Sequence, residues 1–101
     1  MTTLTPVLPD QDVRSDEALV PPYKVILLDD PVTTMEFVVA VLIRFFQKDP
    51  ATAQRLMLEV HTAGASHVAT LPLEQAEMKQ AQVHEAAKAA GFPFRCTIEP
   101  A

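Results

Sequence analysis

The feature that most limits how this chain can fold is the change in spacing of its apolar residues from residue 23 onward. Residues 23–28, YKVILL, are rich in β-branched and aromatic side chains, and they stop at Asp-Asp-Pro. Residues 94–99, FRCTIE, alternate apolar and polar side chains, which is the period of a half-buried strand. With a short run at 66–71, the chain is predicted to contain three strands.

A helix is predicted directly after the first strand. Thr33 and Glu36 have the spacing of a capping box, in which the threonine hydroxyl accepts from the N–H of the glutamate. Apolar residues then recur at helical intervals, so one broad face is expected to be buried. The residues expected on this face are Met35, Val38, Leu42 and Phe45, widened by Val39, Val41 and Phe46.

Two further helices have clear start and stop signals. Asp49 can cap a helix that has Pro50 in its first turn and ends at Gly64. Another opens at Pro72 and closes at Gly91. Their inward faces are expected to be Ala53, Leu56, Met57 and Val60, and then Leu73, Ala76, Val83 and Ala87.

The predicted element order is therefore β-α-α-β-α-β. Three short strands cannot bury both faces of a sheet, so the three helices are expected to pack on one face of an antiparallel or mixed sheet. This gives a small α+β domain at residues 23–101. Residues 1–22 contain many prolines and few large apolar side chains, and they are expected to form a flexible N-terminal extension.

Composition excludes several classes of protein. With 101 residues, 49% of them hydrophobic, the chain has room for one domain and lacks the apolar run of roughly 20 residues that a membrane span needs. The start has no basic region followed by an apolar stretch, so a cytoplasmic protein is expected. The net charge is −5 and the basic residues are scattered, which argues against nucleic acid. The single cysteine, Cys96, is expected to be a reduced core thiol.

No enzyme motif is present. The sequence lacks a glycine-rich phosphate loop, HExxH and CxxC, and it contains only 2 Gly. His61, His67 and His84 fall on different predicted elements and at no known ligand spacing, so no metal and no cofactor are expected.

What remains is a possible binding site. Asp29 and Asp30 at the end of the first strand, and His61 near the end of the second helix, would approach one another if these elements were neighbours. Carboxylates and a ring nitrogen accept hydrogen bonds, and with an apolar surround they would bind a cation joined to an apolar group, such as an N-terminal amino group before a large side chain. A solvated turn and an ordinary core would give the same pattern. The apolar surround would be Met35, Val38, Met57 and Val60.

The segments YKVILLDDPVTTMEFVVAVLIRFF, LMLEVHTAG and FRCTIEP, in this order, resemble ClpS, the adaptor of the Clp AAA+ protease. The resemblance runs from about residue 23 to the C-terminus. It implies an adaptor, and not an enzyme, that holds substrates whose N-terminal residue is Leu, Phe, Tyr or Trp and delivers them to the unfoldase ClpA.

The resemblance also implies residue roles. Asp29, Asp30 and His61 would hold the substrate's α-amino group, and Glu74 and Lys79 would contact the N-terminal domain of ClpA. The N-terminal extension would serve delivery. The pocket for the side chain would be formed by Thr33, Met35, Val38, Met57, Val60 and Phe94.

Two positions depart from the family pattern. The family usually has Asn-Asp-Asp where this chain has Asp29, Asp30 and Pro31. An asparagine both accepts and donates, whereas an ionised aspartate only accepts, and proline has no N–H. An alternative is therefore a regulator that docks on a Clp unfoldase, ClpA or ClpC, and alters its substrate choice without binding N-termini.

Overall fold

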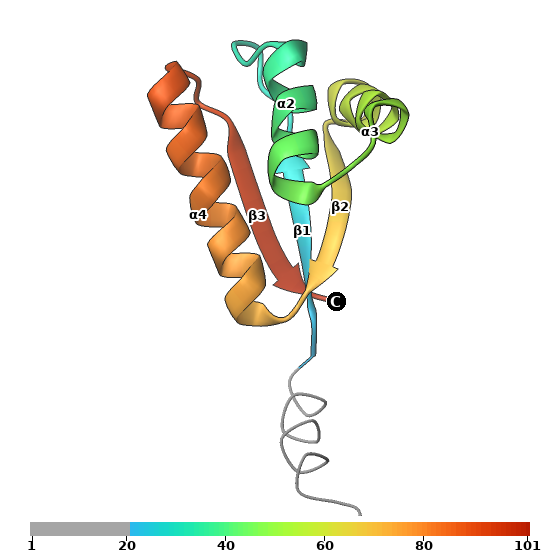
Figure 1. Cartoon of the computed structure of the whole chain (residues 1–101), viewed down its shortest axis with the longest axis vertical. Coiled ribbons are helices and arrows are strands. Elements are labelled where there is room, and N and C mark those ends of the chain that lie inside the picture. The colour runs from blue at the N-terminus through green and yellow to red at the C-terminus, as the bar shows by residue number, and fades with distance from the viewer. Residues whose placement is uncertain (1–20) are drawn as a thin grey trace, which may run out of the picture.

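A computed structural model describes residues 21–101 of the chain. The predicted α+β fold and the predicted element order are both confirmed within this range (Figure 1). The predicted extension at 1–22 lies almost entirely outside the described residues. The elements are β1 (Tyr23–Leu28), α2 (Met35–Phe46), α3 (Pro50–Ala63), β2 (Ala65–Leu71), α4 (Leu73–Ala90) and β3 (Arg95–Pro100).

The sheet places the first strand in the middle. Its order is β2-β1-β3, and β1 is antiparallel to both neighbours. Leu28, the last residue of β1, pairs with Ala65 at the start of β2 and with Arg95 at the start of β3. The loop that follows β1 therefore lies beside the turn between α3 and β2, where the Asp29 N–H donates to the Gly64 carbonyl at 3.0 Å.

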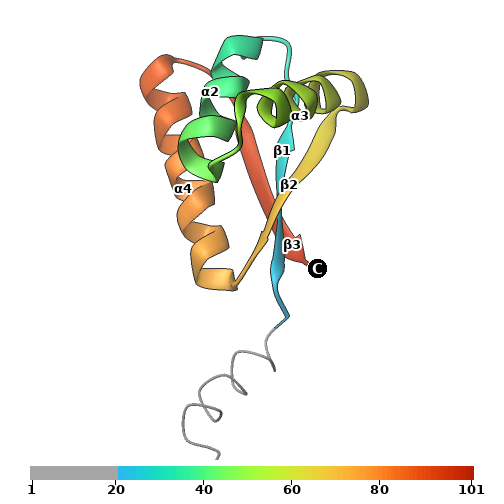
Figure 2. The ribbon, with the colours of Figure 1, turned by 45° about the vertical axis from the view of Figure 1, so that its right-hand side comes forward.

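The three helices cover one face of the sheet, as Figures 1 and 2 show. Val25 and Leu27 of β1 are fully buried against them, whereas Lys24 and Ile26, which alternate with them, are partly exposed. The sheet therefore contributes to the core through the face under the helices. Burying each side chain of this size contributes roughly 1.5–3 kcal/mol to stability. The helices contribute Val38, Val41, Leu42, Phe46, Ala53, Leu56, Met57, Val60, Ala76, Val83 and Ala87 to this core.

The first helix starts one residue later than the predicted capping box requires. Thr34 is the N-cap, and its hydroxyl accepts from the Phe37 N–H at 3.2 Å. The predicted box between Thr33 and Glu36 is wrong because Thr33 is already bound through its N–H and its hydroxyl to Asp30. Met35, expected to face inward, is the first helical residue and is 43% exposed.

The other helix boundaries follow the predicted signals. Asp49 caps α3, accepting from the Thr52 N–H at 3.3 Å and from its hydroxyl at 2.6 Å. Gly64 and Gly91 end α3 and α4 with φ angles of 89° and 81°, a conformation that glycine adopts without steric cost.

Helix α4 closes the outer edge of β3. The Gln80 amide donates to the Cys96 carbonyl at 2.8 Å, and the Cys96 N–H donates to His84 Nε2 at 3.0 Å. Burial and the nearby Arg95 lower the pKa of His84, which agrees with a neutral ring that accepts. Cys96 is free and fully buried, so the expected core thiol is confirmed, and burial raises the pKa of this thiol to about 12. The edge strand thus has its backbone groups at Cys96 satisfied by side chains.

Candidate functional site

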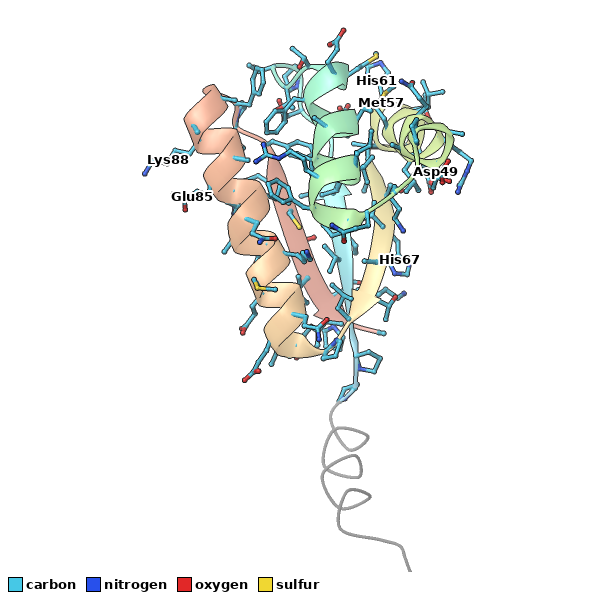
Figure 3. All side chains as sticks on the ribbon, viewed as in Figure 1. Asp49, Met57, His61, His67, Glu85 and Lys88 are labelled. Atoms are coloured by element: carbon cyan, nitrogen blue, oxygen red, sulfur yellow. The ribbon has the colours of Figure 1, made fainter. Side chains whose placement is uncertain are left out.

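Three chain segments meet at one end of the sheet. They are the loop after β1, the start of α2 and the end of α3. The sheet register sets this meeting, since the end of β1 lies beside the start of β2 and hence beside the last turn of α3. His61 and Met57 are one helical turn apart on α3, and Figure 3 shows both side chains at this end of the molecule.

Asp29 and His61 are brought together. Asp29 Oδ1 lies 3.9 Å from His61 Nδ1, which is too long for a direct hydrogen bond but within the reach of an ion pair. The side chains are 35% and 52% exposed, respectively. Both groups are therefore open to a ligand from solvent.

Asp30, which directly follows Asp29, is bound into its own loop. Its Oδ1 accepts from the N–H groups of Val32 (2.9 Å) and Thr33 (2.7 Å), and its Oδ2 accepts from the Thr33 hydroxyl at 2.6 Å. Slight burial raises the pKa of Asp30, but these hydrogen bonds outweigh it and leave the pKa below its usual value. Asp30 is thus a charged residue that also fixes the shape of the loop.

An apolar hollow of about 370 Å³ lies between α2 and α3. Of the predicted pocket residues, Met35 and Met57 line it. Val38 and Val60 lie in the core and are 6% and 1% exposed. The full lining is Met35, Glu36, Val39, Gln54 and Met57.

The sequence analysis missed three of these lining residues. Val39 is one helical turn after Met35, and Gln54 is three residues before Met57. Helical spacing therefore contained the signal for both, and also for Glu36 beside Met35. Glu36 and Gln54 give the mainly apolar hollow a partly polar wall that the predicted set of residues lacked.

The remaining predicted pocket residues have other neighbours. Thr33 is bonded to Asp30, as described above. Phe94 is 2% exposed and packs edge-on against Phe37 of α2, with ring centroids 6.0 Å apart. Phe37 also meets Phe92, with centroids 5.1 Å apart. Phe94 thus supports α2 from the side of β3.

Glu74 and Lys79 lie on α4 and do not belong to this site. Glu74 is exposed in the first turn of α4, and Lys79 is partly exposed further along the helix. Because β2 ends beside Tyr23, α4 begins at the end of the sheet opposite to Asp29. A partner on the start of α4 would therefore leave the Asp29 end of the sheet accessible.

A larger groove of about 690 Å³ lies between α2 and α4. Phe37, Phe45 and Met78 line it together with alanines of α4, and Arg44 and Glu85 contribute one charge of each sign. Asp29 and His61 line neither cavity, but Met57 of the smaller hollow is one helical turn from His61 on α3. The smaller hollow is therefore the better candidate for a site that recognises a cation.

The other polar side chains suggest no metal site. Within residues 21–101, no group of three His, Cys, Asp or Glu side chains is placed to hold a metal ion. His67 is bonded to Thr70, at 2.7 Å. None of the described helices is both long and apolar enough to cross a membrane.

Comparison with known proteins identifies the family. The model of the family described as ATP-dependent Clp protease adaptor protein ClpS matches residues 19–97. A ClpS adapter protein of Nitratidesulfovibrio vulgaris (strain Miyazaki F) is 41% identical over 95 residues, covering 94% of this chain and 91% of its own length. That of Maricaulis maris is 49% identical over 77 residues, covering 76% and 71%.

A solved structure shares the fold. It is Agrobacterium tumefaciens ClpS2 bound to L-phenylalaninamide, with a TM-score of 0.78 and 37% sequence identity. The match covers 80% of this chain and 98% of that chain. With the family match and the relatives above, this likeness leads to one conclusion: the chain belongs to the ClpS family of Clp protease adaptors.

Proposed function

We propose that this protein recognises substrate proteins by a free N-terminal Leu, Phe, Tyr or Trp and delivers them, in the cytoplasm, to the ClpA unfoldase of the Clp protease. It carries out no covalent chemistry itself. The observation that carries the proposal is the pair of exposed acceptors, Asp29 and His61, at the end of the sheet where Met35 and Met57 line an apolar hollow.

The distance between the two acceptors suits one ammonium group. A nitrogen placed about 2.9 Å from each atom, the usual hydrogen-bond length, forms a triangle whose base is the 3.9 Å gap between Asp29 Oδ1 and His61 Nδ1. Asp30, the next residue in the chain, adds a second negative charge, and its hydrogen bonds to Thr33 hold it in the loop. Asp29 and His61 together can therefore hold an α-amino group by two contacts.

The energies explain how a single residue is recognised. Burying a Leu or Phe side chain contributes roughly 1.5–3 kcal/mol, and each hydrogen bond to a charged group contributes about 1.5–3 kcal/mol. An internal Leu has no ammonium group, so binding it would desolvate Asp29 without giving it a partner. The acceptors and the hollow together select the start of a chain.

The ligand of the solved relative has the same two parts. L-phenylalaninamide, which is bound to the Agrobacterium ClpS2, carries a free amino group next to a benzyl side chain. This is the chemistry that the acceptor pair and the hollow of this chain would accommodate. The relative thus supports the proposed class of ligand.

The proposal is tested by fluorescence anisotropy with peptides that start with Phe, Leu or Val. We expect the Phe and Leu peptides to bind more tightly than the Val peptide, and an acetylated Phe peptide to lose most of its affinity. Equal binding of free and acetylated peptides would show that the N-terminus is not recognised.

Delivery is a separate part of the proposal. Glu74 and Lys79 on α4 are proposed to contact the N-terminal domain of ClpA, and the segment before residue 21 is proposed to act in handover. Deleting residues 1–20 should spare peptide binding but abolish ClpA-dependent degradation of a Phe-initiated substrate. Degradation at an unchanged rate by the truncated protein would contradict this role.

One observation favours a second candidate, a regulator that docks on ClpA or ClpC without binding N-termini. Three N–H groups of the loop are already used, since that of Asp29 binds Gly64 and those of Val32 and Thr33 bind Asp30, while Pro31 has none. Four of the six positions from residue 29 to residue 34 therefore offer no free backbone donor to the first carbonyl of a substrate. Docking on the unfoldase without any peptide binding would favour the regulator.

A further inference from the structure

The pair formed by Asp29 and His61 has a property that it would lack if residue 29 were the asparagine that is usual in the family. It is the only pair of opposite charges within 4.0 Å among residues 21–101, and it becomes an ion pair only when His61 is protonated. Both side chains are exposed enough to exchange protons with solvent. Histidine is the side chain whose charge commonly changes between about pH 5 and 8.

This change in charge matters because it alters which groups around Asp29 and His61 can accept a hydrogen bond from a ligand. The N–H groups of Asp29, Val32 and Thr33 are already used, Pro31 has none, and an ionised aspartate only accepts. With His61 neutral, its Nδ1 and the Asp29 carboxylate can both accept from an ammonium group. With His61 protonated, Nδ1 carries a hydrogen next to Asp29 Oδ1, the oxygen that the ammonium would use.

We propose that a substrate's α-amino group and the proton of His61 compete for the Asp29 carboxylate, so that substrate binding releases a proton and weakens in acid. This inference rests on the proposed function, because it requires Asp29 and His61 to bind an ammonium group. It adds a direction to that function: the adaptor captures N-termini at neutral pH and loses them as the pH falls.

The other charged groups near His61 do not take the role of Asp29. In the loop, Asp30 is held by Thr33 and Val32. On α2, Glu36 lines the hollow beyond Met35, and the Arg44 guanidinium lies over the Phe45 ring at 5.2 Å from its centre. The charged residues elsewhere on α3 and β2 are Asp49 beside the start of α3, Arg55, Glu59 and His67, and none of them pairs with His61 within 4.0 Å.

The titration of the substrate cannot mimic the predicted effect. A peptide α-amino group has a pKa of about 7.7–8.0, so a lower pH makes it more fully charged. This change alone would strengthen binding to carboxylates. A loss of affinity on acidification must therefore come from the protein.

The test measures binding of a Phe-initiated peptide at pH 7.0 and pH 5.5 by anisotropy, at a temperature where circular dichroism shows every variant folded. We expect the affinity to fall by at least about threefold, since one competing proton changes it by up to about tenfold per pH unit. Calorimetry at pH 6.5 in two buffers of different ionisation enthalpy should show a net proton release on binding.

Three variants separate the possible causes. His61→Gln should remove the pH dependence, and Asp29→Asn should reduce it by removing the charge that attracts the proton. His67→Gln, which changes an exposed histidine on β2, is the matched control and should behave as the unmodified protein. Binding that is equal at both pH values and releases no proton would overturn this inference alone, whereas no binding at either pH would overturn the proposed function with it.

Discussion

Two histidines at different places in the fold show what decides the role of such a residue. His61, in the last turn of α3, is 52% exposed and faces a carboxylate across 3.9 Å. His84, on α4, is largely covered and accepts a hydrogen bond from the Cys96 backbone. The first has unused hydrogen-bonding capacity and belongs to the candidate site. The second is committed to holding a helix on an edge strand, so the partner, and not the residue type, separates recognition from structure.

The largest effect should come from the exposed side of this comparison. Asp29→Ala removes one charge-assisted contact, which is worth about 1.5–3 kcal/mol, so peptide affinity should fall by roughly 10- to 150-fold. Stability should stay within about 0.5 kcal/mol, because the side chain is exposed and makes no hydrogen bond within the described chain. Anisotropy and urea denaturation measure the two quantities. An unchanged affinity would place recognition elsewhere.

The buried side should respond in the opposite way. His84→Ala leaves the Cys96 N–H without a partner, and an unsatisfied buried donor costs about 1–3 kcal/mol of stability. Peptide affinity per folded molecule should not change. Thermal denaturation and anisotropy test this, with His67→Ala as the exposed control. A variant that unfolds like the unmodified protein would show that this bond does not stabilise the seam between α4 and β3.

A smaller loss is expected from the other half of the same seam. Gln80→Ala removes the amide that donates to the Cys96 carbonyl, and a bond of this kind contributes about 0.5–1.5 kcal/mol. The loss of stability in the double variant with His84→Ala should differ from the sum of the two single losses, because both side chains bind the same residue. Strict additivity would indicate that the two hydrogen bonds act independently.

The smallest effect should be that of pH on stability, because in mild acid His84 is protonated in only part of the unfolded chains. The pKa of His84 in the folded protein is below the usual 6.5, so the unfolded chain takes up the proton first. Stability should therefore be constant above about pH 6.5 and decrease as the pH falls below it. Urea denaturation at several pH values measures this. His84→Ala should lose the part of the slope that is due to His84.

Local signals in the sequence were enough for most of the fold. The cap at Asp49, the proline after it and the glycines at 64 and 91 act within a few residues, and the structure has the helix boundaries where they predict them. The start of α2 was misplaced because two threonines compete for the cap. The choice depends on Asp30, which binds the first threonine and leaves Thr34 to cap the helix.

The site was less predictable because its parts are far apart in the chain. The meeting of Asp29 with His61 depends on the pairing of β1 with β2, which follows from no local pattern. The contacts of Gln80 and His84 with Cys96 span 16 and 12 residues, and their polar spacing on α4 resembles that of a solvated face. Resemblance to the family supplied the residue roles that periodicity could not.

The single hydrogen bond from Asp29 to Gly64 has a consequence for how such a site can evolve. It ties together the two backbone segments that carry the acceptors, so it limits how far Asp29 and His61 can move apart. Gly64 has a φ of 89°, and apart from the adjoining chain no heavy atom lies within 4 Å of where a Cβ would stand. A replacement there would strain the turn without a clash, so this position, which is not itself an acceptor, would adjust how Asp29 lies relative to His61.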